Sequence, residues 1–77
     1  MLRRIAEIPT NAQQGSIRCL SIVDDESSPG AVFLCEHESL EEPYVFDTWC
    51  ESLQIALDCA KDRWGLAEDS WRNEETP

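Results

Sequence analysis

Residues 52–66, which read SLQIALDCAKDRWGL, decide the fold. With successive residues turned by about 100° around a helix axis, the apolar side chains of this stretch gather on one side and the charged ones fall on the other. The pattern predicts an amphipathic helix over residues 52–64, with a narrow apolar stripe that faces a core. The stripe consists of Leu53, Ala56, Leu57, Ala60 and Trp64.

Both ends of this helix carry capping signals. Ser52 is the preferred N-cap, because its hydroxyl can accept a hydrogen bond from a backbone N–H of the first turn. Thr48 followed three residues later by Glu51 also matches a capping box, which would start the helix four residues earlier. Gly65 can adopt the left-handed conformation that ends a helix, and Leu66 is then expected to fold back onto the last turn.

Three stretches before the helix have the composition of β-strands, with apolar, β-branched and aromatic residues and little charge. They are residues 17–23 (IRCLSIV), 31–36 (AVFLCE) and 44–49 (YVFDTW). Turn-forming residues over 24–30 (DDESSPG) join the first two into a predicted hairpin. Asp47 indicates that the third strand has one face in water or lies at a sheet edge. Residues 2–8 fit a short strand and a helical turn equally well.

These elements predict an α+β fold, a three- or four-stranded antiparallel sheet with one C-terminal helix packed across one face. The whole chain, residues 1–77, is expected to form a single small domain. Trp71 is expected to cover one end of the core, and residues 72–77 are expected to be disordered. A single helix of this length covers only part of such a sheet, so some apolar sheet surface is expected to stay open.

The charge is strongly acidic and unevenly placed. Sixteen acidic and six basic side chains leave a net charge of -10, and residues 19–60 contain ten acidic residues and no Lys or Arg. This balance opposes nucleic-acid binding, which depends on Lys and Arg. The acidic stretch is typical of a solvated surface, and its functional alternative is a face that steers a basic partner. Calcium binding is not expected, because Asp24-Asp25-Glu26 lacks the alternating ligand spacing of a calcium loop.

The sequence also bears on location. No apolar run reaches the 18 residues that a membrane span needs, so no membrane segment is expected. The chain starts with Met1-Leu2-Arg3-Arg4, but Glu7, Pro9 and Asn11 interrupt any apolar segment of a signal peptide. We therefore expect a cytoplasmic protein.

Four cysteines and one histidine are the candidates for chemistry. Cys19, Cys35, Cys50 and Cys59 include no Cys-x-x-Cys pair, so neither a zinc ribbon nor a thioredoxin-type site is predicted. We expect reduced, inert thiols; the alternatives are disulfides and a zinc site that combines Cys35, His37, Cys50 and Cys59. His37 stands among glutamates and is expected at the surface. Because no catalytic, phosphate-binding or metal motif is present, we expect no enzyme activity, no cofactor and no metal.

Residues 44–71 resemble a pattern found in small bacterial proteins. In this sequence the pattern consists of Phe46-Asp47-Thr48-Trp49 at a strand end, alanine-spaced helix positions Ala56 and Ala60, the pair Trp64-Gly65, and a closing Trp71. The resemblance implies the strand end, helix face, helix stop and closing aromatic residue. It implies no activity.

Taken together, the sequence predicts a non-enzymatic acidic protein-interaction module with an unidentified protein partner, and a weak homodimer is one form of it. Ile55 and Cys59 fall on the outward face of the helix and are candidate contacts, together with Glu41 and Glu42 of the acidic loop. The alternative function is an immunity- or inhibitor-type protein whose acidic face binds a basic partner. A zinc-binding module is the second alternative.

Overall fold

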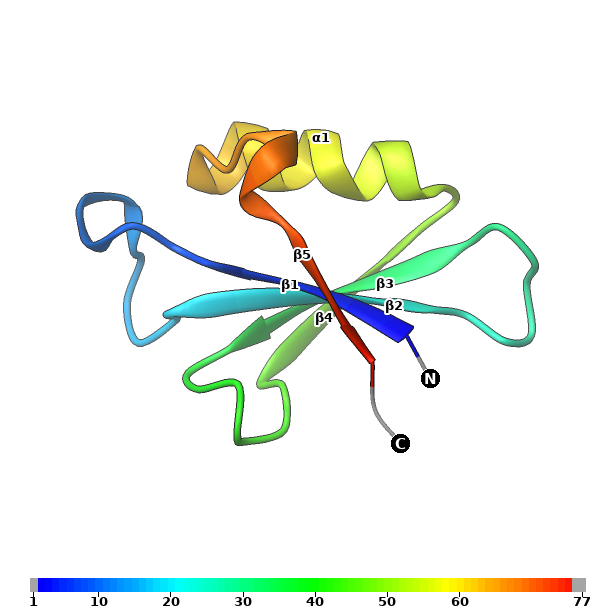
Figure 1. The fold of residues 1–77 in the computed structure, drawn as a ribbon, viewed down its shortest axis with the longest axis horizontal. Coiled ribbons are helices and arrows are strands. Elements are labelled where there is room, and N and C mark those ends of the chain that lie inside the picture. Colours follow the sequence, from blue (N-terminus) through cyan, green and yellow to red (C-terminus); the bar gives the residue numbers. More distant parts are fainter. Residues whose placement is uncertain (1, 76–77) are drawn as a thin grey trace.

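A computed structural model describes residues 2–75, and it contains a five-stranded antiparallel sheet with one α-helix packed against it (Figure 1). The strands lie in the order β4-β3-β2-β1-β5. Their bounds, with those of the helix, are β1 (Leu2–Glu7), β2 (Cys19–Asp24), β3 (Val32–His37), β4 (Phe46–Cys50), α1 (Leu53–Trp64) and β5 (Arg72–Glu75). The α+β class is confirmed, with one strand more than the largest number predicted.

The connections explain the strand order. β1 to β4 form a meander in which each strand pairs antiparallel with the one before it. From the β4 edge the chain enters α1, which lies over one face of the sheet, and β5 then pairs antiparallel with β1 at the opposite edge (Figure 1). Residues 2–8, left open between strand and helical turn, therefore supply a strand with two neighbours.

The main core lies between α1 and the sheet. Alternate strand residues, among them Leu20, Ile22, Val32 and Leu34, meet Ala56, Ala60 and Trp64 of the helix in one buried cluster. Ala56 and Ala60 are fully buried, and their small side chains let the helix backbone approach the strands closely. Leu53, Leu57 and Trp71 are partly buried against the same cluster. The predicted apolar stripe and the covering position of Trp71 are confirmed.

Both ends of the helix have the caps that the sequence predicts. Ser52 Oγ accepts a hydrogen bond from the Ile55 amide at 3.2 Å, so the helix begins after Ser52 and not at Thr48. Gly65 has a φ of 69°, and its amide donates to carbonyls of the last turn. Leu66 is buried behind it, as expected.

The C-terminal residues depart from expectation. Residues 72–77 were expected to be disordered, but the structure places Arg72–Glu75 as β5 on β1; residues 76–77 lie outside the described residues. β5 contains no apolar residue, so its own sequence gives no strand signal. It is held by backbone pairing and by ion pairs from Glu74 to Arg3 and from Arg72 to Glu7, the second at 3.9 Å.

A chain shortened to end at Trp71 tests this strand. We expect its free energy of unfolding in urea to fall by about 2 kcal/mol or more, because several backbone hydrogen bonds of about 1 kcal/mol each are lost and Ile5 loses its neighbour. The matched control ends at Glu75 and should unfold like the full chain. Equal stability of the two shortened chains would contradict a structural role for β5.

Candidate functional site

A second buried layer lies on the sheet face turned away from α1. Because side chains alternate along a strand, the residues between the core positions of β1, β2 and β3 point to this face. The β3–β4 loop folds beneath it (Figure 1). The buried side chains of this layer, each no more than 3% exposed, are Ile5, Cys19, Ser21, Cys35 and His37.

The polar centre of this layer is a hydrogen-bonded Ser-His pair. Ser21 Oγ lies 2.7 Å from His37 Nε2, and His37 Nδ1 lies 3.1 Å from the carbonyl oxygen of Glu42. A carbonyl oxygen only accepts, so Nδ1 carries a proton, and in the neutral imidazole Nε2 then accepts from the Ser21 hydroxyl. The expectation that His37 lies at the surface is wrong, because its side chain is only 3% exposed. Both ring nitrogens have hydrogen-bond partners inside the protein, and these bonds offset the cost of burying the ring.

The hydroxyl, imidazole and acceptor of this pair follow one another as in a serine hydrolase, but a substrate could not reach the serine. A nucleophilic serine must reach a substrate, and Ser21 is only 2% exposed while His37 is 3% exposed. Neither side chain lines the pocket described below. In this arrangement, the pair fixes the β3–β4 loop against the sheet through the Glu42 carbonyl.

Three of the four thiols, those of Cys19, Cys35 and Cys50, are similarly buried, although Cys19 also lines one wall of the pocket described below. Burial raises the pKa values of Cys19, Cys35 and Cys50 above the ordinary thiol value. For Cys35 the Ser21 hydroxyl offsets part of this rise, and for Cys50 the neighbouring Cys59 adds to it. All four cysteines are free thiols.

The residues of the zinc alternative do not converge. Cys35 and His37 point to the face away from the helix, whereas Cys50 belongs to the core beneath α1 and Cys59 packs against that core. Within residues 2–75, no group of three or more His, Cys, Asp or Glu side chains could hold a metal ion. In the same range, no helix has the length and apolarity of a membrane span.

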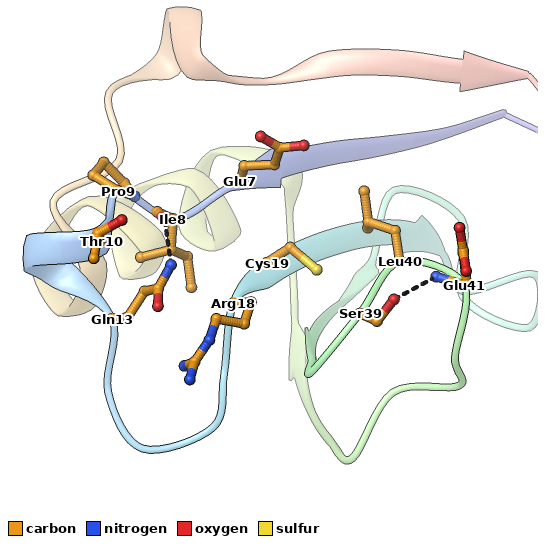
Figure 2. A pocket seen from close by; sticks show the side chains of 10 residues that line it. All are labelled: Glu7, Ile8, Pro9, Thr10, Gln13, Arg18, Cys19, Ser39, Leu40 and Glu41. Carbon is orange, nitrogen blue, oxygen red and sulfur yellow. Dashed lines mark hydrogen bonds between the residues drawn. The ribbon is translucent and has the colours of Figure 1, made fainter.

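A pocket of about 690 Å³ opens between the β1–β2 and β3–β4 loops (Figure 2). Arg18, Glu7 and Glu41 bring one positive and two negative charges to its lining, beside apolar Ile8 and Leu40. The Arg18 guanidinium already donates to the carbonyl of Gly15 at 2.9 Å. The remaining lining residues include polar side chains that bond to nearby backbone, such as Gln13 to Ile8 and Ser39 to Glu41. This mixture indicates no particular ligand chemistry.

The most unusual surface is the free edge at β4. Of the side chains that the structure describes, the exposed large apolar ones all fall within residues 44–55, on β4, the residues just before it and the first turn of α1. They are Tyr44 (51% exposed), Val45 (56%), Phe46 (56%), Trp49 (49%) and Ile55 (43%). In the described part of the chain β4 pairs only with β3, so its other side presents unpaired backbone groups.

The opposite edge of the sheet shows what a protected edge looks like. β5 reads RNEE and carries charged or amide side chains along its length. Charged edge strands discourage the addition of another strand. β4 reads FDTWC and carries exposed aromatic residues instead, with Asp47 as its single charge. Of the two sheet edges formed by residues 2–75, the β4 edge is the one that combines unpaired backbone with exposed apolar side chains.

Trp49 is held in place by the β2–β3 loop. Its indole N–H donates to Asp25 Oδ2 at 3.0 Å, while Ser27 donates to Asp25 Oδ1 from its hydroxyl and its amide. These hydrogen bonds, those from Ser27 first, lower the pKa of Asp25. Trp49 also pairs across the strands with Phe33. The exposed ring is thus positioned in advance for contact.

The predicted contact residues fall at separate places. Ile55 is exposed, as expected. Cys59 was expected on the outward helix face, but it is half-buried and packs against the core. It lies about 60° from Ala56 around the helix axis, close enough to the apolar stripe to be drawn in. Glu41 and Glu42 are exposed in the β3–β4 loop, where Glu41 lines the pocket and Glu42 binds His37 through its carbonyl.

Sequence reasoning missed the edge residues as a site. The sequence predicts that residues 44–49 form an aromatic strand that lies at a sheet edge or has one face in water. Its aromatic side chains are not among the predicted contacts. The signal was present in the juxtaposition of Tyr44, Val45 and Phe46 with a charge inside the strand. Comparison with family models, with curated proteins and with solved structures found no match for this chain.

Replacing Ser21 by Ala tests the buried pair. We expect the free energy of unfolding to fall by about 1–2 kcal/mol, because His37 Nε2 stays buried without a donor. Ser16→Ala, at an exposed position, should change stability by less than about 0.5 kcal/mol. Equal stabilities of the two variants in urea unfolding would show that the hydrogen bond contributes nothing.

Thiol labelling tests the burial of the cysteines. In the native protein at pH 8, we expect Ellman's reagent to react first with half-buried Cys59, and slowly with the other three thiols, because burial and raised pKa values keep them as unreactive thiols. Cys59→Ser should remove the fast phase. A fast phase that survives in this variant would contradict the enclosed position of the remaining cysteines.

Proposed function

We propose that this protein is a non-enzymatic protein-interaction module that binds an extended segment of a partner protein along β4. The observation that carries the proposal is the free edge on which Phe46 and Trp49 are about half exposed beside unpaired backbone. Strand addition to such an edge is a common mode of peptide recognition, in which backbone hydrogen bonds supply affinity and side chains supply specificity.

The proposal accounts for an arrangement that is costly in an isolated domain. Exposed apolar side chains on an unpaired edge promote aggregation. β5 avoids this with its charged side chains. Burying a Phe or Trp side chain contributes about 2 kcal/mol, so two or three such contacts can support a specific complex. The enclosed state of Ser21, His37 and three of the cysteines supports a binding role over a catalytic one.

The experiment is a selection from displayed random peptides of about eight residues on the immobilised protein, since a strand of this length spans β4. We expect the enriched peptides to bind the wild-type protein and the Ala67→Ser variant, and to lose binding to Phe46→Ser. Ala67 is the control because it is an exposed apolar residue between α1 and β5, outside the exposed apolar surface of residues 44–55. Circular dichroism establishes that both variants are folded.

Two results would refute this function. One is a selection without enrichment over a blank surface. The other is a set of enriched peptides that bind Phe46→Ser as tightly as the wild type, because their site would then lie elsewhere on the molecule.

A further inference from the structure

We infer that the segment bound along β4 is basic, with Lys or Arg side chains on the sheet face turned away from α1 and apolar side chains on the helix side. This inference rests on the proposed function and adds the chemistry of the partner. It follows from three properties of the edge: its negative charge, the alternation of its side chains between the two sheet faces, and the contacts that the exposed rings of Phe46 and Trp49 offer to an added strand.

The sequence on and beside β4 is acidic. Asp47 lies on the strand, Glu51 follows it, and Glu42 is exposed in the loop before it; residues 19–60 contain no Lys or Arg. Glu41 of the same loop lines the pocket with Arg18 and is not counted here. Complementary charge speeds association and rejects partners of like charge.

One basic side chain reaches this region from α1. Arg63 Nη1 lies 3.6 Å from Glu36 Oε2, and Glu36 is the cross-strand neighbour of Phe46. Because this cation is paired with a carboxylate, it does not reverse the charge of the edge. It also lies on the helix side of the sheet, where we expect the partner's apolar side chains.

The alternation along β4 assigns a different contact to each face. Phe46 and Thr48 lie opposite Glu36 and Leu34 and so point to the helix side, whereas Asp47 and Trp49 point to the other face. An added strand alternates in the same way. On the face away from the helix, its side chains meet a carboxylate and an indole ring, which together favour Lys or Arg through an ion pair and a cation–π contact. On the helix side they meet Phe46.

A second copy of this chain is a poorer occupant of the edge. Two β4 strands side by side would bring together the Asp47 and Glu51 carboxylates of both copies, and each copy carries a net charge of -10. Like charges placed opposite each other across strands are destabilising. The Asp47 carboxylate, on the face away from α1, therefore acts against self-pairing while it favours a basic strand.

The test uses eight-residue synthetic peptides with a fluorescent label, followed by fluorescence anisotropy on the full chain. The first alternates Val and Lys, the second Val and Glu, the third Val and Thr, and the fourth Ser and Lys. We expect the Val/Lys peptide to bind at least about tenfold more tightly than the others, because it alone supplies both contacts. Raising the salt from 50 to 300 mM should weaken its binding severalfold.

Matched variants locate the charge. Asp47→Asn should weaken binding of the Val/Lys peptide by about fivefold or more, whereas Asp69→Asn, at an exposed acidic position between α1 and β5, should leave it unchanged. A Val/Lys peptide with alternate N-methylated backbone amides should bind far more weakly, because it cannot complete strand pairing.

The outcomes separate this inference from the function on which it rests. Preferred binding of the Val/Thr or Val/Glu peptide, lost in Phe46→Ser, would overturn the basic partner and leave strand addition intact. Equal binding of the Ser/Lys and Val/Lys peptides, or equal effects of Asp47→Asn and Asp69→Asn, would also overturn it. Concentration-dependent dimerisation that Phe46→Ser abolishes would assign the edge to a second copy. Failure of every peptide to bind would count against both proposals.

Discussion

The whole arrangement depends on close packing of one helix across the sheet. Ala56 and Ala60 are fully buried, and their small side chains bring α1 down onto the strands. Because α1 follows β4 at one edge and β5 pairs with β1 at the other, the crossover decides which edge is closed. The chain continues past the β1 edge and covers it with a charged strand, and it leaves the outer side of β4 without a neighbour within the described residues.

The same constraint divides the chemistry of the molecule between two faces. The helix covers an apolar face, and the opposite face needs other means to exclude water. Ser21 and His37 satisfy each other there, and the Glu42 carbonyl brings the β3–β4 loop beneath them. Ser21 and His37, whose side chains are of the kinds that hydrolases use, are buried here and pack between the sheet and the loop. The β4 edge combines exposed aromatic side chains with unpaired backbone groups, and the proposed binding role rests on this edge.

Much of the fold could be predicted from local sequence, but the parts set by distant contacts could not. The helix, with Ser52 and Gly65 at its ends, follows from periodicity and capping, which act within a few residues. β5 carries no apolar residue and forms because β1 offers a partner, so nothing within residues 72–75 could reveal it. His37 looked exposed among glutamates because its partner Ser21 is brought near only by the β2–β3 register. Cys59 lay at the border of the helix stripe, where periodicity alone does not decide burial.

The candidate site shows the same division. Asp47 predicts that the strand over residues 44–49 has one face in water or lies at a sheet edge, and the structure places it at an edge. The exposure of Phe46 and Trp49 depends on where the helix lies and which edge β5 closes. The contacts predicted at Ile55, Glu41 and Glu42 are exposed as expected, and their role in binding stays a prediction.

Amide hydrogen exchange on the free protein, resolved by residue with NMR at micromolar concentration, tests the open edge most directly. If β4 is an ordered edge strand, its amides should be protected at alternate residues, where they bond to β3, while amides of the central strands β2 and β3 are protected throughout. Uniform protection along β4 would mean that its outer side is already covered, and absence of protection would mean that the strand is not formed. Either result would contradict a free edge prepared to receive a partner strand.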